Sequence, residues 1–335
     1  MRSGAPSSEP NGSRSTRLRH GTGFSVAVLS ASLLGLTPIL GKQAIQAGLS
    51  PLAVVSARTL VAAGLLAAGV LLFRRRALAI YPVGLVGCLI AGGLNGAGSL
   101  LYYSALARID AGLGQILFSL HPVFVALVLY LDGQRPSRST VGKLALGLVA
   151  VLLLTQTTPR PLDTTGVLLM LGAGALYGLH IPINQRVLYD VPAPTVTLYT
   201  LIAMTAVVVP VQLLVVGVPP APQASLLPVA GLAAVTFLSR LTLFAGIQSI
   251  GGMQASLLGL LQLVVAVFLS LILLHESLSP LQWAGAILLG AVLLLPESTV
   301  DSVRTGVRRG WLSWIRPPVL SAPAPRSDRH EPPTD

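Results

Sequence analysis

The chain has 335 residues, of which 53% are hydrophobic and only 10% are charged, and its mean hydropathy is +0.77. Soluble domains carry about 25% charged residues, so this composition excludes an ordinary water-soluble protein. The net charge of +11 does not indicate nucleic-acid binding, because the basic residues flank apolar segments and form no stripe interleaved with aromatic residues. The single cysteine, Cys88, can form no intramolecular disulfide and no cysteine metal site, and no cofactor is expected.

Ten apolar segments follow one another along the chain. A helix needs about 20 mostly apolar residues to cross roughly 30 Å of hydrocarbon, and turn-forming or charged residues separate most of the segments. We therefore predict an all-α integral membrane protein with ten transmembrane helices. In chain order these are residues 22–41, 51–73, 80–105, 111–131, 140–157, 165–185, 194–217, 226–249, 253–274 and 280–296.

The loops between these segments predict the orientation, because lysine and arginine accumulate on the cytoplasmic side. A cytoplasmic N-terminus leaves only Lys42, Arg108 and Arg160 on the opposite side, and an even number of spans returns the C-terminus to the cytoplasm. The excess of arginine over lysine, beside abundant Ala, Leu and Gly, is typical of a GC-rich bacterial genome. These features predict a multi-pass protein of the bacterial cytoplasmic membrane.

The two ends of the chain are rich in Ser, Pro, Gly and charge. This composition predicts a disordered N-terminal tail over residues 1–21 and a basic tail over residues 297–335. Within the second tail, residues 303–315 place Trp311 and Trp314 among arginines. That pattern favours a short helix on the inner leaflet, and the alternative is a solvated basic tail.

An internal repeat relates the two parts of the sequence at an offset of 143 residues. It predicts halves at residues 22–157 and 165–296 with five spans each. Because five is odd, the second half must enter the membrane from the opposite side, so the repeat is inverted. The matched positions include Thr22-Gly23 with Thr165-Gly166, Gly35-Leu36 with Gly178-Leu179, and Pro51 with Pro194.

Short motifs occur in both halves: Gly35-Leu-Thr-Pro38, Pro51 followed by Arg58, Tyr103-Ser-Ala-Leu106, and the stretch from His275-Glu276 through Gln282 to Gly285. These motifs resemble those of the EamA-type transporters of the drug/metabolite transporter superfamily. The resemblance implies two five-helix domains and transport of amino acids or related metabolites, often outward. The first half departs from the pattern, because its acid is Asp132 and no glutamine precedes Gly142.

Ionisable residues inside a span are costly, which makes them candidates for a functional site. Arg58 and Arg240 are the charges well inside predicted spans, and no carboxylate lies near the midplane. A cavity with this balance favours a substrate with a carboxylate or phosphate, which arginine can hold by two hydrogen bonds. Either arginine could instead be a structural anchor, and Arg58 could extend towards the surface.

Helix breaks at corresponding positions of the two halves are expected to flank a transporter's site. Pro38 and Pro182 are nearly equivalent in the repeat, and Pro122 marks a further break after His121. Each proline removes one backbone hydrogen bond and frees a carbonyl. We expect breaks at all three prolines.

Around Pro182, the residues Tyr177, His180 and Asn184 share one helix face at i, i+3 and i+7 spacing. We predict that this face binds substrate, together with Arg240, Arg58 and His121, and that the site is weighted towards the second half. His121 and His180 could carry a proton, although a histidine satisfied within the core is the alternative. Weaker candidates, which could equally bond between helices, are Asn95, Tyr102, Tyr103, Gln115, Tyr199, Gln248, Gln254 and Gln262.

These observations favour a secondary transporter of small, carboxylate-bearing polar metabolites that works by alternating access and exports its substrate. The expected partners are that substrate and the lipid bilayer, and a homodimer is compatible with the sequence. A transport-inactive membrane scaffold is an alternative that a core lined only by Leu, Val and Gly would support. A membrane-embedded enzyme is the other alternative, although the sequence shows neither an HExxH motif nor paired intramembrane aspartates.

Overall fold

The computed structural model describes residues 12–73, 75–109, 111–134, 136–154, 163–217, 223–274, 280–294 and 310–315. All regular secondary structure within these residues is helical, as predicted. The first half contains α1 (Gly12–Gly35), α2 (Thr37–Gln46), α3 (Pro51–Phe73), the short 3₁₀ helix η1 (Arg75–Leu78), α4 (Pro82–Leu106), α5 (Ala111–Phe118), α6 (His121–Leu131) and α7 (Arg138–Leu154). The second half contains α8 (Thr164–Leu188), α9 (Ala193–Val215), α10 (Gln223–Ile250), α11 (Gly252–Leu258), α12 (Leu261–Leu274) and α13 (Pro280–Leu294).

Within the described residues, six helical stretches are long and apolar enough to cross a membrane. They are Thr22–Gln46, which joins α1 to α2, then α3, α4, α8, α9 and Ser225–Ile250 of α10. The other predicted spans fall on shorter helices. The predicted fourth span of each half is divided, into α5 and α6 in the first half and α11 and α12 in the second. The predicted fifth spans fall on α7 and α13.

The distribution of polar side chains is the reverse of that in a water-soluble protein. Leu214, Leu227 and Phe73 are 86%, 82% and 84% exposed, whereas Asn95 and Gln115 are only 2% and 3% exposed. Lipid suits an outer surface of apolar side chains. Helices can face it because their backbone polar groups are hydrogen-bonded internally. The fold is therefore that of a multi-pass membrane protein.

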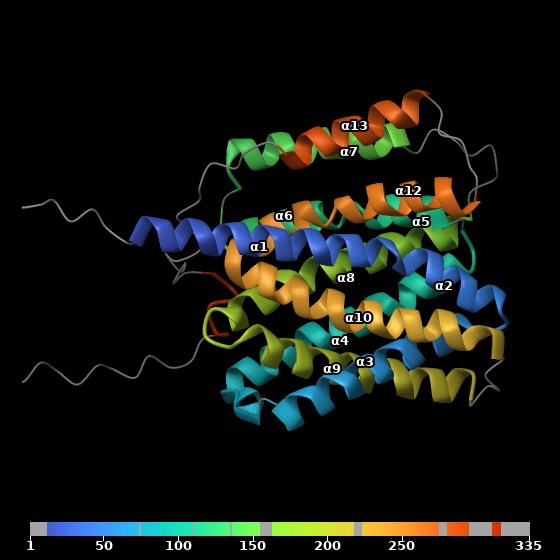
Figure 1. The fold of residues 1–335 in the computed structure, drawn as a ribbon, viewed down its shortest axis with the longest axis horizontal. Coiled ribbons are helices and arrows are strands. Elements are labelled where there is room, and N and C mark those ends of the chain that lie inside the picture. Colours follow the sequence, from blue (N-terminus) through green and yellow to red (C-terminus); the bar gives the residue numbers. More distant parts are fainter. Residues whose placement is uncertain are drawn as a thin grey trace, which may run out of the picture.

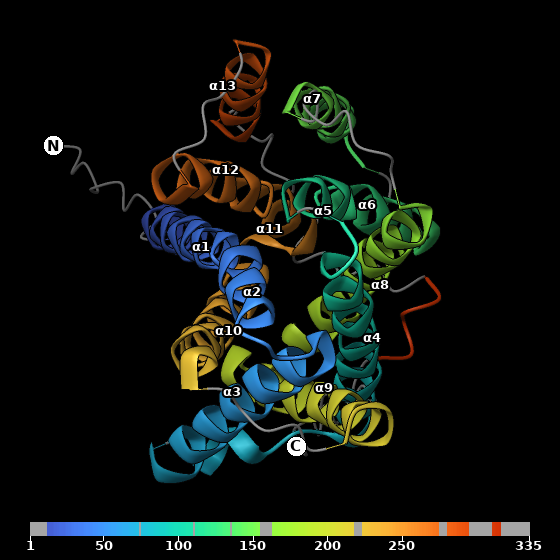
Figure 2. The same ribbon diagram turned by 90° about the vertical axis from the view of Figure 1, so that its right-hand side faces the viewer.

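The two halves interlock, and their contacts come in matched pairs (Figures 1 and 2). α1 packs on α10 as α4 packs on α8, and α3 packs on α10 as α9 packs on α4. The contact of α1 with α12 is matched by that of α8 with α6. α7 and α13 pack against each other beside the main bundle, as Figure 2 shows. Neither half therefore forms a separate core.

Small residues allow the central helices to approach closely. A Cβ atom on Gly92 of α4 would lie 2.5 Å from the carbonyl oxygen of Thr200 in α9, and a Cβ atom on Gly178 of α8 would lie 2.5 Å from Cβ of Phe124 in α6. Both distances are shorter than any ordinary contact, so neither glycine can be replaced without moving a helix. These contacts fix α4 and α8, which carry much of the site described below.

The structure differs from the sequence predictions at both ends of the chain. α1 begins at Gly12, inside the tail that we predicted to be disordered, because an apolar span that is already helical can extend without a new nucleation cost. Of residues 303–315, where we predicted a surface helix, the structure describes residues 310–315, which form turns with Leu312 and Ile315 buried. Residues 1–11, 301–309 and 316–335 lie outside the described residues, as does the His275-Glu276 part of the family motif.

Candidate functional site

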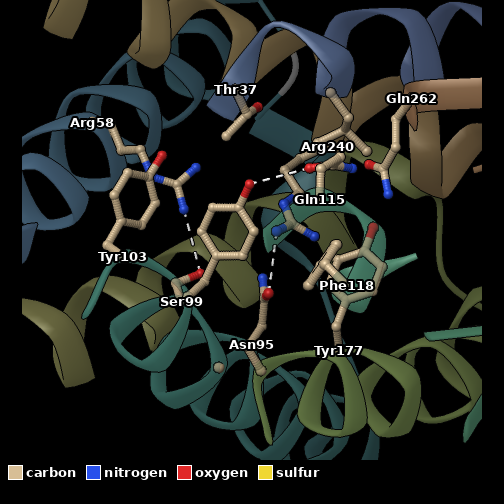
Figure 3. A pocket seen from close by; sticks show the side chains of 14 residues that line it. Thr37, Arg58, Asn95, Ser99, Tyr103, Gln115, Phe118, Tyr177, Arg240 and Gln262 are labelled. Carbon is tan, nitrogen blue, oxygen red and sulfur yellow. Dashed lines mark hydrogen bonds between the residues drawn. The ribbon is translucent and has the colours of Figure 1, made fainter. Parts of the chain in front are cut away.

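A cavity lined by residues of both halves lies between the helices, and Figure 3 shows the side chains that line it. Its volume is about 50 Å³, which is room for a few water molecules. Most of its lining comes from the first half, contrary to the expected weighting towards the second. The lining residues are Leu34, Thr37, Arg58, Asn95, Gly98, Ser99, Tyr102, Tyr103, Gln115, Phe118, Ala173, Tyr177, Arg240 and Gln262.

Arg58 reaches the cavity from α3 and is only 5% exposed. Its Nη1 donates to Oγ1 of Thr236 in α10 at 3.0 Å, and its Nη2 donates to Oγ of Ser99 in α4 at 3.3 Å. The guanidinium carbon lies 4.9 Å from the centroid of the Tyr103 ring. All of these partners are uncharged, so the cation is solvated by hydroxyl groups and an aromatic ring and is not neutralised.

Arg240 reaches the same cavity from α10, in the second half, and is also 5% exposed. Its Nη2 donates to Oδ1 of Asn95 at 3.1 Å, and its Nη1 lies 3.5 Å from Nε2 of His180. The guanidinium carbon stands 5.4 Å from the centroid of the Tyr177 ring. Arg240 therefore resembles Arg58 in having neutral hydrogen-bonding partners and an aromatic neighbour.

The cavity lining contains two cations and no carboxylate. Among the described residues, the ion pairs lie elsewhere: Arg108 with Asp163, and Arg186 with Asp132. A buried charge without a counter-charge is costly, because neutral dipoles replace water only in part. The cavity can therefore accept an anion, which would compensate charge that the protein leaves uncompensated.

Several buried polar atoms at the cavity have no hydrogen-bonding partner. They are Nε of Arg58, Nε2 of Gln115, Nε2 of Gln262 and the hydroxyl of Tyr103. The side-chain oxygen of Gln115 is occupied, because it accepts from the hydroxyl of Tyr102 at 3.2 Å. Buried polar groups are normally satisfied, so these atoms mark places where a ligand or water can bind.

The predicted face of α8 is divided by the structure. Tyr177 lines the cavity, whereas His180 lies behind it in contact with the Tyr177 ring, with centroids 4.6 Å apart. Asn184 lies outside the lining, where its Oδ1 accepts from Oγ1 of Thr200 in α9 at 3.2 Å. Of the three residues, only Tyr177 faces the cavity directly.

The contact with Arg240 also favours one tautomer of His180. Arginine has donors only, so Nε2 of His180 must be the acceptor in that contact. The proton of the neutral ring then sits on Nδ1, which faces the carbonyl oxygen of Tyr177. His180 therefore supports Arg240 as a neutral ring in this state.

His121 lies beside the main cavity, in a smaller cavity that Tyr177 and Gln262 also line. Its ring stands 4.9 Å from that of Tyr177, edge to face. Its Nδ1 lies 3.0 Å from the carbonyl oxygen of Phe118, at the end of α5. That carbonyl has lost its helical donor because Pro122 has no N–H, so His121 satisfies the break that Pro122 creates.

The helix breaks are only partly those predicted. Pro38 stands at the start of α2 after a break at Leu36, and Pro122 at the start of α6 after a break at residues 119–120. Pro182 is different, because α8 continues through it without interruption. α8 packs against α4, α5, α6 and α9, and we attribute its continuity to these contacts, which retain the helix when one backbone bond is lost.

The second half has a break that the sequence did not reveal. α11 ends at Leu258 and α12 begins at Leu261, although no proline is present. This break corresponds to the one between α5 and α6, and Gln262 follows it as Pro122 follows the other. The useful signal would have been the repeat itself, which aligns the two fourth spans.

Five of the weaker candidates line the cavity: Asn95, Tyr102, Tyr103, Gln115 and Gln262. Two others bond to backbone outside it, because the hydroxyl of Tyr199 donates to the carbonyl of Leu78 at 2.7 Å and Nε2 of Gln248 donates to that of Leu188 at 3.1 Å. The sequence reasoning missed Thr37, Ser99, Phe118 and Thr236. Ser99 could have been found, because it lies one turn after Asn95 on the same face of α4.

The residues around the cavity offer no arrangement for a metal. Among the described residues, no three His, Cys, Asp or Glu side chains lie close enough together to hold a metal ion. The donors at the cavity are guanidinium, amide and hydroxyl groups, which suit the oxygen atoms of an anion.

The fold and the site together define a multi-pass membrane protein with a positively charged cavity between two interlocked halves. A family model described as the EamA-like transporter family matches residues 21–156 and 164–295, so the chain belongs to this family. The resemblance predicted from the sequence is thereby confirmed, and the protein is a membrane transporter of this kind. No curated protein matches the chain.

The fold also matches a solved structure. One chain, described as "Crystal structure of protein", superimposes with a TM-score of 0.64 at 18% sequence identity. The match covers 82% of this chain and 96% of the other. At this identity the similarity concerns the fold.

Proposed function

We propose that the protein is a secondary transporter of small, carboxylate-bearing metabolites, such as amino acids or related compounds. One observation carries this proposal: Arg58 and Arg240 face the same buried cavity, one from each half, and no carboxylate accompanies them. A carboxylate can accept two hydrogen bonds from one guanidinium group, which fits the geometry that arginine offers. Unpartnered donors on Gln115 and Gln262 add further positions for substrate oxygens.

The proposed mechanism is alternating access. Ten membrane crossings in two inverted halves would place the cavity near the midplane, and the matched helix contacts between the halves support this arrangement. A volume of about 50 Å³ is too small for a metabolite, so substrate binding requires the halves to move apart. We assign the protein to the bacterial cytoplasmic membrane with both termini inside, on the distribution of basic residues, and we assign export on the family resemblance.

The arginine, amide and hydroxyl groups in the lining argue against the two alternatives. A transport-inactive scaffold would need no buried cations, and removing them would make its core less costly. An enzyme of the kinds considered from the sequence would need an HExxH motif or paired aspartates, whereas the cavity lining contains neither histidine nor carboxylate.

The test is flux in reconstituted vesicles. A panel of carboxylate-bearing metabolites is loaded with and without a pH gradient, which identifies both substrate and coupling. We expect that Arg240→Ala abolishes the flux while the protein remains in the membrane. The exposed Arg108→Ala is the matched control and should transport normally. Unchanged flux in Arg240→Ala would refute the assignment of the site.

A further inference from the structure

We infer that the substrate carries two separate acidic groups, one for each guanidinium group of the cavity. This inference rests on the proposed function and names the substrate class more narrowly. The two arginines are bound separately, because they come from α3 and α10 and share no hydrogen-bonding partner. Figure 3 shows their guanidinium groups as distinct centres at the cavity.

The charge balance requires two anionic groups for full compensation. Arg58 and Arg240 are each 5% exposed, so water compensates neither of them well. A substrate with one carboxylate would neutralise one arginine and leave the other buried with neutral partners only. A substrate with two carboxylates neutralises both arginines. The monocarboxylate complex is the more costly of the two, because one buried charge is left without a counter-charge.

The unpartnered atoms point to the same ligand. Nε of Arg58, Nε2 of Gln115 and Nε2 of Gln262 are all donors, and each belongs to a side chain at most 5% exposed. A site with spare donors and no spare carboxylate suits a ligand that is rich in acceptor oxygens. The rings of Phe118 and Tyr177, whose centroids lie 5.1 Å apart, provide an apolar wall for the carbon chain between the acids.

The first test is ligand-induced stabilisation of the purified, full-length protein. The thermal unfolding midpoint is measured with the dicarboxylates malonate, succinate, glutarate and adipate, with the monocarboxylate butyrate, and with sulfate, all at one concentration and ionic strength. A ligand that binds the native state raises the midpoint. We expect the largest rise with one of the dicarboxylates. A rise with butyrate or sulfate that equals the best dicarboxylate would overturn the inference, and so would no rise with any dicarboxylate.

The second test removes one anchor at a time. In Arg58→Gln and in Arg240→Gln, the preference for the best dicarboxylate over butyrate should fall roughly tenfold or more, because one charge-assisted contact is lost. The exposed Arg108→Gln should keep the preference. Flux of monocarboxylate metabolites without any flux of dicarboxylates would overturn this inference and leave the proposed function standing, whereas no flux of any carboxylate would refute both.

A buried ion pair lies at the end of the bundle where α6 and α8 finish. Arg186 of α8 forms a buried ion pair with Asp132, which caps α6, and thus joins the two halves. Oδ1 of the same aspartate accepts from the backbone N–H of Leu312 at 2.9 Å. We propose that residues 310–315 form a latch that holds this end of the transporter closed.

The side chains of the latch are inserted among the helices. Leu312 and Ile315 are 1% and 0% exposed and belong to the same core cluster as Val187 of α8. The carbonyl oxygen of Ile315 accepts from the hydroxyl of Tyr81, just before α4, at 3.4 Å. Opening this end requires the halves to separate at the Asp132–Arg186 pair, so the latch must leave its place first.

Cys88 provides a natural reporter, because it is the single cysteine of the chain and is fully buried. It follows Gly87, where an added Cβ atom would lie 3.0 Å from Cγ2 of Ile315. The rate of alkylation by N-ethylmaleimide is compared between a chain that stops after residue 309, which lacks the latch, and one that stops after residue 315, which keeps it. We expect alkylation about tenfold faster without the latch, because the hydrogen bond from the Leu312 N–H to the charged Asp132 is lost.

Two further measurements keep this test decisive. Leu312→Ser, in the full-length chain, removes one apolar anchor and should also accelerate labelling. Gel filtration and the unfolding midpoint confirm that each variant is folded. Two results would overturn the latch. The first is equal labelling rates in the two truncated chains when both are folded. The second is labelling of the chain that stops after residue 315 that is about tenfold faster than labelling of the full-length protein.

Discussion

The molecule contains two kinds of buried arginine. At the end of the bundle, the Arg186 side chain is 2% exposed and is paired with Asp132, whose side chain is 0% exposed. In the cavity, Arg58 and Arg240 are nearly as buried, yet their partners are neutral. The difference separates structure from function: a charge compensated within the protein holds helices together, whereas a charge left uncompensated is available to a ligand.

The largest expected effect is on the paired arginine. Asp132→Ala removes one partner of the buried ion pair that Arg186 forms, and breaking a buried pair in this way typically costs about 3–5 kcal/mol of stability. We expect a fall of that size in the free energy of unfolding, measured by reversible unfolding in detergent micelles. A loss comparable to that of an exposed ion pair would remove the distinction between the two kinds of arginine.

Arg240→Gln should have the opposite profile. Flux should fall roughly 10- to 150-fold, because a charge-assisted hydrogen bond to the substrate is lost. The unfolding midpoint without substrate should be no lower than that of the wild type, since a buried cation without a counter-charge is removed. A midpoint that falls as far as in Asp132→Ala would show that Arg240 is structural.

A smaller effect is expected from Arg58→Lys, which retains the charge. Lysine is a point charge and cannot offer the planar pair of donors that holds a carboxylate. We expect the apparent substrate affinity to weaken by about tenfold, in transport assays over a range of substrate concentrations. Wild-type affinity in the lysine variant would indicate that charge alone is recognised.

The smallest effect concerns the exposed pair of Arg108 and Asp163. Hydrogen bonds from the backbone N–H of Gly166 and, less strongly, from Arg108 outweigh desolvation and hold the pKa of the Asp163 carboxyl below its ordinary value of 3.8. A carboxyl with a lowered folded-state pKa contributes its stabilisation above the ordinary value and loses it as pH falls through the folded value. Asp163→Asn, which keeps the capping oxygen, should therefore unfold slightly earlier than wild type at pH 7, and the difference should shrink as the pH falls below 3.8. A difference that stays constant as the pH falls would exclude the charge as its cause.

Much of the fold could be predicted, because hydropathy and the repeat depend on physics that is local or periodic. The six long spans, Arg58 and Arg240 all follow from the cost of polar groups in hydrocarbon. The cavity residues Asn95, Tyr102, Tyr103, Gln115 and Gln262 were identified only as weak candidates. Sequence alone cannot show which face of a buried helix points to a cavity and which to a neighbouring helix.

The remaining errors have tertiary causes. Pro182 leaves α8 unbroken, and we attribute this to the neighbouring helices that hold it, whereas α12 is separated from α11 without any proline. Asn184 faces α9 instead of the cavity. The packing of Leu312 and Ile315 depends on Asp132, which lies 180 residues away from Leu312 along the chain. Local patterns carry no information about such contacts.

The interlocked halves have a consequence for how the protein is made. Arg58 lies in the first half, and its partner Thr236 is 178 residues further along the chain. While the ribosome is still synthesising the second half, this arginine has already entered the membrane region without that hydroxyl. The first half on its own therefore exposes polar groups to lipid and is a natural client for the insertion machinery until α10 arrives. When the halves are expressed as separate chains, the first half should escape degradation only if the second half is expressed with it.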